Sequence, residues 1–86
     1  MPIRFRFKVG AYEQLVGLPR IVQVRILEKL TWYEMTLEPL DFAKRLKGGK
    51  FGEYRFRVGE CRLLCDVQKN NDIIVLAVGH RKDIYR

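Results

Sequence analysis

The middle of the sequence predicts a β-hairpin centred on Gly59-Glu60. The flanking segments Tyr54–Val58 and Cys61–Cys65 are rich in arginine, aromatic and branched apolar residues, and both have the length of a strand. Glycine at the first of two central residues is typical of a type II′ turn, which joins neighbouring antiparallel strands. We therefore predict a two-residue hairpin in which Val58 is paired with Cys61.

One face of this hairpin is expected to carry arginines. The turn brings Arg57 opposite Arg62 and Phe56 opposite Leu63. Because side chains alternate between the two faces of a strand, Arg55 lies on the arginine face as well. Like charges directly opposite each other destabilise a sheet by roughly a few tenths of a kcal/mol. A sequence that accepts this repulsion indicates an anionic ligand, and a phosphodiester is the first candidate.

The length and charge of the chain limit the possible functions. With 86 residues, of which 48% are hydrophobic, it is expected to form a single domain, residues 1–86, with one small core. The formal net charge of +7 favours polyanionic partners. Ordinary solubilising charge would give the same total, so the inference rests on where the arginines lie. The first predicted strand adds Arg4, Arg6 and Lys8 on one face.

The N-terminal half is predicted to form a strand and two helices. Residues 3–9 alternate apolar and basic side chains, which predicts a strand. A short helix is expected over Ala11–Val16, ended by Gly17. Apolar residues then recur at three- and four-residue spacings from Arg20 to about Met35, which predicts an amphipathic helix packed on a sheet.

The C-terminal half is predicted to be mostly strand. Residues 41–50 form a basic connector, Asn70–Asp72 a polar turn, and the β-branched run Ile73–Val78 a strand covered on both faces. With the hairpin, the element order is β-α-α-β-β-β. The predicted fold is α+β, with a small, mostly antiparallel four-stranded sheet and an N-terminal helical hairpin packed on one face.

Cys61 and Cys65 are expected to be reduced, buried core thiols. They lie four residues apart in one strand, so their Cα atoms are ~13 Å from each other, too far for a disulfide. Reduced thiols fit a cytoplasmic protein. The N-terminus has no signal-peptide pattern, and no apolar run approaches the ~20 residues of a membrane span. No membrane association is expected.

The composition supports few kinds of active site. The chain contains no serine, a single histidine at His80, and no glycine-rich phosphate loop between a strand and a helix. The two cysteines have no basic neighbour on their own face, which disfavours a thiolate mechanism. Only Asp83 lies near His80 as a second metal ligand. No metal and no cofactor are therefore expected.

Four segments together resemble the RelE/ParE superfamily of bacterial and archaeal toxins. They are Leu46-Lys47-Gly48, Tyr54-Arg55-Phe56-Arg57, Cys61-Arg62-Leu63-Leu64 and Val78-Gly79-His80-Arg81-Lys82-Asp83-Ile84-Tyr85-Arg86, of which the last is the most specific. The resemblance covers the whole chain and implies a RelE-like fold. RelE-type members are mRNA interferases that cut messenger RNA in the ribosomal A site, and a cognate antitoxin neutralises them. ParE-type members poison DNA gyrase.

For a RelE-type member the resemblance implies a metal-independent endoribonuclease. The 2′-hydroxyl of one nucleotide attacks the adjacent phosphate, leaving a 2′,3′-cyclic phosphate and a 5′-hydroxyl, while cations stabilise the developing charge. The implied catalytic residues are Arg57, Arg62, His80, Arg81 and Tyr85. The residues expected to bind RNA are Arg4, Arg6, Lys47, Lys50, Arg55 and Lys82.

His80 enters this set because arginine is a poor base. RelE-type toxins often carry lysine at the positions of Arg55 and Arg57, whereas an arginine with a pKa above ~12 hardly gives up its proton. Histidine titrates near neutrality, which makes His80 a candidate for proton transfer. Arg81 could act as an electrophilic clamp or as an acid. Tyr85 could stack on a splayed base.

Two other functions stay open at this point. A ParE-like inhibitor would bind gyrase and cleave nothing, although it has no need for converging phosphate clamps. A nucleic-acid-binding module without catalysis would show salt-dependent RNA binding. In the toxin interpretations, the helices over residues 11–35 are the expected docking region for the antitoxin. The antitoxin is expected to be acidic where it meets the arginines and to cover the tail around Tyr85.

Overall fold

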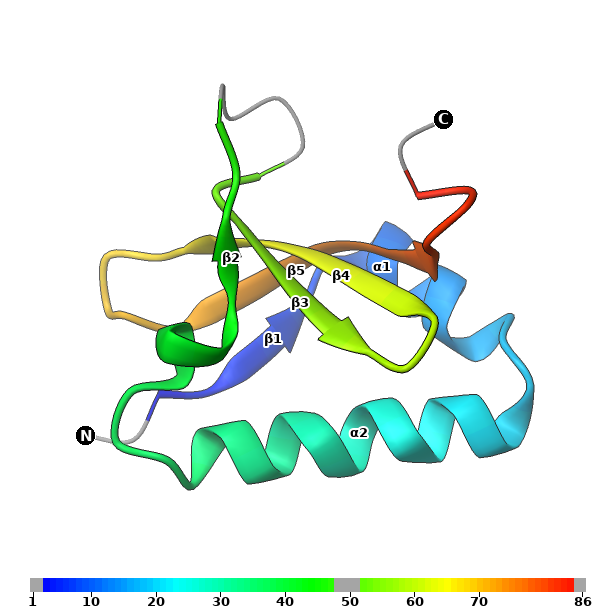
Figure 1. Cartoon of the computed structure of the whole chain (residues 1–86), viewed down its shortest axis with the longest axis horizontal. Helices are drawn as coiled ribbons and strands as arrows, with labels where there is room; N and C mark the ends of the chain where they lie inside the picture. The colour runs from blue at the N-terminus through cyan, green and yellow to red at the C-terminus, as the bar shows by residue number, and fades with distance from the viewer. Residues whose placement is uncertain (1–2, 48–51, 85–86) are drawn as a thin grey trace.

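The computed structural model describes residues 3–47 and 52–84, in which two α-helices pack against one twisted sheet (Figure 1). Of the predicted site residues, Lys50 and Tyr85 lie outside the described residues, as does Gly48-Gly49. The elements are β1 Phe5–Phe7, α1 Val9–Val16, α2 Arg20–Glu34, the 3₁₀ helix η1 Pro39–Phe42, β2 Lys44–Arg45, β3 Tyr54–Val58, β4 Cys61–Val67 and β5 Ile73–His80. The strand order is β1-β5-β4-β3-β2, with β1 and β5 parallel and the other neighbours antiparallel.

The α+β class and the two predicted helices are confirmed, but the described sheet has five strands where the sequence predicts four. The additional strand, β2, lies inside the predicted connector. It has two residues, both exposed, so it lacks the apolar alternation by which a sequence pattern reveals a strand. Its pairing with Tyr54 and Arg55 of β3 defines it.

The hairpin between β3 and β4 has the predicted register. Arg57 lies opposite Arg62, and Val58 lies opposite Cys61. Gly59 has a φ of 58°, whereas the φ of the next residue is not positive. A positive φ at the first central residue alone is what a type II′ turn requires, so the predicted turn is confirmed.

A β-bulge interrupts the pairing of β4 with β5. Leu64 lies opposite Ala77, whereas the next residue, Cys65, lies opposite Val75. Leu76 is therefore the extra residue on β5. An extra residue shifts the alternation of side chains by one position. Each side chain after the bulge therefore lies on the face opposite to the one it would occupy in a regular strand.

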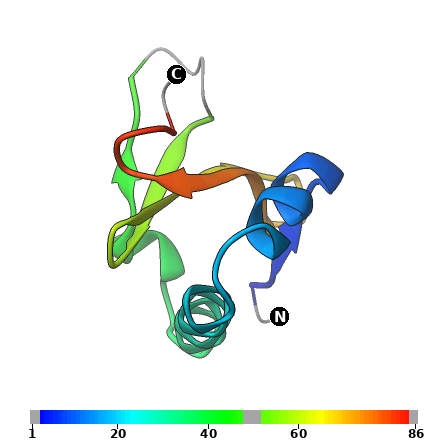
Figure 2. The same ribbon diagram turned by 90° about the vertical axis from the view of Figure 1, so that its right-hand side faces the viewer.

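Beyond the end of β1, groups at the start of α1 and within it form hydrogen bonds with the edge of β5. Lys8 donates its backbone N–H to the carbonyl of Val75 at 3.0 Å, and the side-chain oxygen of Gln14 accepts the N–H of Val78 at 2.8 Å. Figure 2 shows α1 beside β5, with α2 below the sheet. Within the described residues, neither helix has the length and apolar character needed to cross a membrane.

The core lies between the helices and one face of the sheet. Tyr33 of α2 packs against Phe5 of β1 and Phe56 of β3, with ring centroids 6.3 and 5.1 Å apart. Cys61 and Cys65 belong to this core as free thiols. Burial is the main reason that the pKa of each thiol is raised. The prediction that both cysteines are buried and form no disulfide with each other is confirmed.

Candidate functional site

The arginine face of the sheet has one row of positions across three strands. Arg57 of β3, Arg62 of β4 and Gly79 of β5 are in register. Directly opposite residues point to the same side of a sheet, so the two arginine side chains adjoin a position without a side chain. A Cβ atom at residue 79 would lie 3.1 Å from Cδ1 of Ile84. The turn after β5 therefore folds against this face.

Arg62 is the buried member of this row. Only 7% of its surface is exposed. Its Nη1 donates hydrogen bonds to the carbonyl oxygens of Gly59 at 3.1 Å and Cys61 at 3.0 Å. These carbonyls fix the guanidinium against the turn of the hairpin, and they leave its positive charge without a carboxylate in direct contact among the described residues.

Electrostatics show that further arginines surround Arg62. Burial lowers the pKa of its guanidinium first, and the positive charges of Arg57, Arg55 and Arg81 lower that pKa further. Glu60 acts in the opposite direction. The structure therefore brings together four of the predicted site residues. The Arg62 guanidinium remains protonated, because the pKa of an arginine is very high to begin with.

Arg81 begins the turn after β5 and is held by Glu60. Its backbone N–H donates to the Glu60 carbonyl at 2.8 Å, and its Nε forms an ion pair with Oε2 of Glu60 at 2.7 Å. Sequence reasoning identified Glu60 as a turn residue and missed this role. The available signal was an acidic side chain placed between two strands that carry arginine.

The structure places His80 on the opposite face of the sheet from Arg62. It is paired with Cys61, which faces the core, so its imidazole lies on the helix side of the sheet. There it lines a cavity of about 320 Å³ with residues of α2, including Ile26. Its Nδ1 accepts the backbone N–H of Lys82 at 3.1 Å. The bulge at Leu76 is the physical reason, because it moves His80 off the face of Arg62.

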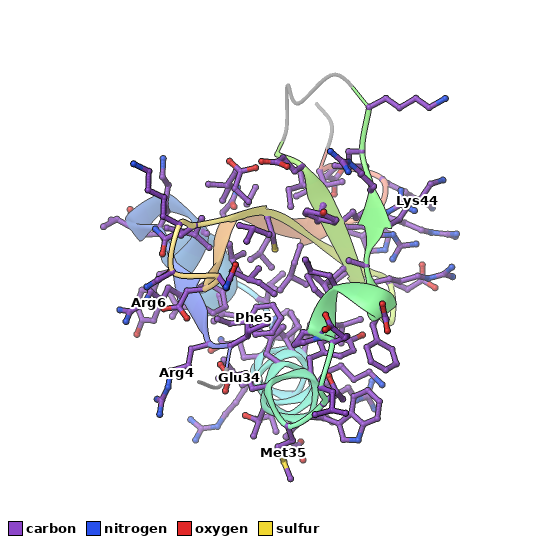
Figure 3. All side chains as sticks on the ribbon, turned by 90° about the vertical axis from the view of Figure 1, so that its left-hand side faces the viewer. Arg4, Phe5, Arg6, Glu34, Met35 and Lys44 are labelled. Carbon is purple, nitrogen blue, oxygen red and sulfur yellow. The ribbon has the colours of Figure 1, made fainter. Side chains whose placement is uncertain are left out.

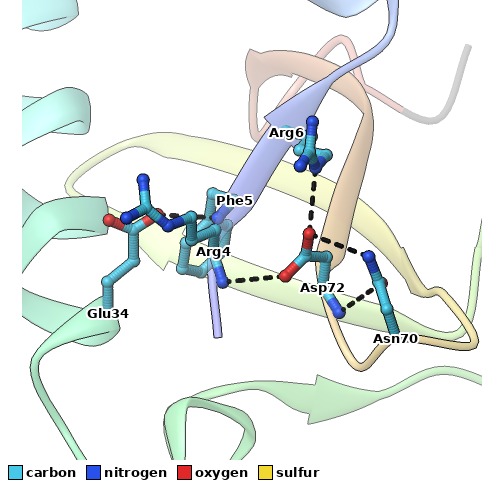
Figure 4. Close-up of polar contacts among 6 residues, drawn as sticks. All are labelled: Arg4, Phe5, Arg6, Glu34, Asn70 and Asp72. Atoms are coloured by element: carbon cyan, nitrogen blue, oxygen red, sulfur yellow. Dashed lines mark hydrogen bonds and ion pairs between the residues drawn. The ribbon is translucent and has the colours of Figure 1, made fainter. Parts of the chain in front are cut away.

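Arg4 and Arg6 lie at the opposite edge of the sheet from β2 (Figure 3). The Nε of Arg6 pairs with Oδ2 of Asp72 at 2.9 Å, and the backbone N–H of Arg4 donates to Oδ1 of the same carboxylate at 3.2 Å (Figure 4). The hydrogen bond from Arg6 is the largest of the causes that lower the pKa of Asp72. Strand β5 lies between these two arginines and β4, and along β5 Arg6 is in register with Ile74 whereas Arg62 is in register with Gly79.

Of the lysines predicted to bind RNA, the structure describes Lys47 and Lys82. Lys47 follows β2 and Lys82 lies in the turn after β5, and both are exposed. Lys44 is in register with Arg55, so it adds a basic side chain to the arginine face. It was missed because β2 itself was not predicted.

This arrangement is suited to holding a phosphate. Guanidinium groups bind phosphate oxygens in pairs of hydrogen bonds and keep their charge at any working pH. Across residues 3–47 and 52–84, no three His, Cys, Asp or Glu side chains are grouped as a metal site requires.

Comparison with known proteins identifies the class. The family described as the ParE toxin of type II toxin–antitoxin systems, parDE, matches residues 6–85. Toxin RelG of Mycobacterium tuberculosis is 32% identical over 87 residues, covering 100% of this chain and 99% of the relative.

Solved structures give the same result. A chain of the toxin–antitoxin complex RelBE2 from M. tuberculosis has a TM-score of 0.78 at 28% identity, covering 94% of this chain and 100% of its own. A chain of the archaeal RelE–RelB complex from Pyrococcus horikoshii has a TM-score of 0.73 at 27% identity, covering 96% and 99%. The fold is thus a toxin fold. The chain belongs to the ParE toxin family of type II toxin–antitoxin systems, and the resemblance to the RelE/ParE superfamily is confirmed.

Proposed function

We propose that this toxin is a metal-independent endoribonuclease that cleaves messenger RNA in the ribosomal A site and so inhibits translation in the cytoplasm. The observation that supports it is the gathering of Arg55, Arg57 and Arg81 around the buried Arg62. Guanidinium groups gathered in this way repel one another, and a phosphodiester would relieve that repulsion while being held in a bent geometry. A surface that only binds gyrase has no need for such a cluster.

In the proposed reaction the 2′-hydroxyl oxygen attacks the adjacent phosphorus and the bond to the 5′-oxygen breaks. Water takes the proton from the 2′-hydroxyl and supplies one to the departing 5′-oxygen, which leaves as a 5′-hydroxyl. Arg62 and Arg81 stabilise the negative charge that develops on the phosphoryl oxygens, with Arg57 beside them. Tyr85 stacks on a base next to the cleaved bond. The backbone of the RNA is bound by Lys44, Lys47, Lys50, Arg55 and Lys82. We leave Arg4, Arg6 and His80 out of this set because of where they lie in the fold.

Cell-free translation tests the proposal. The purified toxin is added to a bacterial extract that translates one defined message, and primer extension maps the 5′ ends of the fragments. We expect translation to stop and cut message with 5′-hydroxyl ends to accumulate. Arg62→Ala should abolish the cuts, whereas Arg20→Ala, which removes the same charge from the exposed start of α2, should not. Intact message together with arrested translation would contradict the proposal.

A gyrase inhibitor is the second candidate, favoured by the description of the matching family as a ParE toxin. The discriminating measurement is supercoiling of plasmid DNA by purified gyrase in the presence of the toxin. Under the nuclease proposal supercoiling continues unchanged. Arrested supercoiling with uncut message would establish the alternative.

We also propose that a cognate antitoxin binds the outer face of α2. Exposed apolar side chains follow this face, among them Ile21 at 63%, Leu27 at 46% and Met35 at 80% exposure, and Met35 points away from the molecule in Figure 3. Contiguous exposed apolar surface is typical of an interaction site. Two similar structures are complexes named for a toxin and an antitoxin, or for RelE and RelB.

Calorimetry with the product of the neighbouring open reading frame tests this surface. Leu27→Asp should weaken antitoxin binding at least ~10-fold, because it places a charge in the centre of the apolar stripe. Glu13→Gln on the exposed side of α1 serves as the control. Unchanged binding of the Leu27 variant would move the antitoxin to another face.

A further inference from the structure

The turn between β3 and β4 anchors two arginines of the site. The carbonyl of Gly59 accepts a hydrogen bond from Arg62, and the carbonyl of Glu60 accepts one from the N–H of Arg81. The carboxylate of Glu60 reaches Nε of Arg81 at 2.7 Å. One two-residue turn therefore connects the central strand of the site to the turn that follows β5.

The two arginines depend on this turn to different degrees. Arg62 lies inside β4 and is 7% exposed, so its backbone and packing already restrict its side chain. The Arg81 side chain is 52% exposed and starts from a turn. A long exposed side chain keeps most of its rotamer freedom unless a partner holds it. Glu60 is that partner among the described residues.

Charge makes such a partner necessary. Arg55, Arg57 and Arg81 each act on Arg62 as like charges, and Glu60 acts on it as the opposite charge. An exposed guanidinium that is repelled by its neighbours would turn outward into water, where the repulsion is screened. A carboxylate beside it removes this tendency before any RNA is bound.

We propose that Glu60 is a positioning residue for the reaction, whose carboxylate holds the Arg81 guanidinium at the site in the orientation that meets the phosphate. The inference rests on the proposed nuclease function. The contact engages Nε, and guanidinium carries four further N–H donors on its two terminal nitrogens. Those donors face the phosphoryl oxygens in this scheme, while Glu60 touches no reacting atom.

A structural ion pair would behave differently from a positioning residue. Exposed pairs contribute little to stability, so Glu60→Ala should leave the unfolding midpoint in urea nearly unchanged. Misplacing a group by about 1 Å can cost on the order of 100-fold in rate. The signature of positioning is therefore a loss in kcat without a matching loss in folding or in KM.

A double-mutant cycle tests the proposal through cleavage. We expect Glu60→Ala to lower kcat about 10-fold with KM little changed, and Arg81→Ala to lower it by roughly 100- to 1000-fold. In the Arg81→Ala background, Glu60→Ala should have no further effect. Glu60→Gln should recover part of the rate, because the amide oxygen still accepts a hydrogen bond from Nε. Glu13→Ala on α1 controls for net charge.

Two outcomes of the cycle overturn the proposal. One is an unchanged kcat in Glu60→Ala. The other is the same loss of rate in the presence and absence of the Arg81 side chain, which would mean that Glu60 acts through another group.

NMR separates failure of this inference from failure of the nuclease proposal. The Nε–H resonance of Arg81 should exchange slowly with water in the wild type and rapidly in Glu60→Ala. This measurement needs no RNA and no cleavage. If the toxin leaves message intact, the nuclease proposal fails, and the exchange rate still decides whether Glu60 holds Arg81. An Nε–H that exchanges equally fast in both proteins overturns the inference.

Discussion

The two ends of the sheet both carry arginine, and they use it in opposite ways. At the β1 end, Arg6 is paired with Asp72 at 2.9 Å, and its charge is neutralised. At the β3–β4 end, Arg62 is buried against carbonyl oxygens and faces other arginines. The comparison teaches that the partners of an arginine, and not its position on a strand, decide whether its charge is neutralised within the fold.

The β1 end needs such partners because its strand is short. Only three residues of β1 pair with β5 in parallel. Side-chain groups extend the pairing, since Glu34 of α2 accepts the N–H of Phe5 at 2.7 Å and Asp72 accepts the N–H of Arg4 at 3.2 Å (Figure 4). This end is a satisfied network, whereas at the other end four arginines act on one another as like charges, which the proposed function explains by RNA binding.

The largest expected effect comes from Arg62→Met, which keeps much of the buried volume and removes the charge. Single-turnover cleavage should fall by roughly 100- to 1000-fold, as when one donor to a developing oxyanion is lost. The free energy of unfolding should be unchanged or rise by about 1 kcal/mol, because replacing a buried charge by an apolar group is often neutral or stabilising. Urea denaturation measures it. A loss above about 3 kcal/mol, the size expected when a buried network is broken, would mean that Arg62 mainly supports the fold, and the contrast between the two ends would disappear.

Gly59→Ala should give the next largest effect, on stability. The φ of 58° at this turn is strained for a residue with a Cβ, so we expect a loss of roughly 1–2 kcal/mol in the free energy of unfolding. Gly10→Ala is the matched control, because Gly10 lies in α1 with open space around it. That variant should gain about 0.5–1 kcal/mol. Equal effects in the two variants would contradict the turn geometry.

The stability that Asp72 gives to the β1 end is expected to depend on pH. The hydrogen bonds from Arg6 and Arg4 lower the pKa of Asp72 in the folded protein. A carboxyl with a lowered folded pKa contributes stability that is fully present above its unfolded pKa of about 3.9. That contribution is lost as the pH falls through the lower, folded pKa. We therefore expect the wild type to be more stable than Asp72→Asn at pH 6.

Urea denaturation from pH 6 downward measures this difference. The gap between the two proteins should narrow below about pH 4 and vanish at the acid end. A gap that stays constant with pH would show that the Asp72 charge does not stabilise the β1 end. Cleavage is not involved, which keeps this prediction independent of the arginine site.

The sequence predicted the arginine face because that face depends on local rules. Gly59-Glu60 determines the turn, and the turn determines the pairing of Arg57 with Arg62. The alternation of side chains along the strands then determines which residues share the arginine face. The ion pair and the hydrogen bond between Glu60 and Arg81 could not be predicted in this way. It joins residues from separate turns, and only the three-dimensional pairing of β4 with β5 brings them together.

The same alternation rule does not give the face on which His80 lies, because a bulge interrupts β5. Strict alternation from Ile73 and Val75, which face the core, would place position 80 on the arginine face. The extra residue Leu76 shifts the alternation, so Val78 and His80 face the helices and Gly79 faces the arginines. A bulge has no reliable sequence signal in a continuous apolar run, where every register buries apolar side chains.

His80→Ala should have the smallest effect on cleavage of these variants. A general base contributes typically 100-fold or more to the rate. Because His80 lies on the opposite face of the sheet from Arg62, its removal should change the single-turnover rate less than about 3-fold. Stability should fall by about 1 kcal/mol, because the N–H of Lys82 loses its acceptor. His80→Asn, whose side-chain oxygen can replace Nδ1, should recover part of that loss. A 100-fold slower reaction in both variants would place the imidazole at the scissile phosphate and reverse the assignment of faces beyond the bulge.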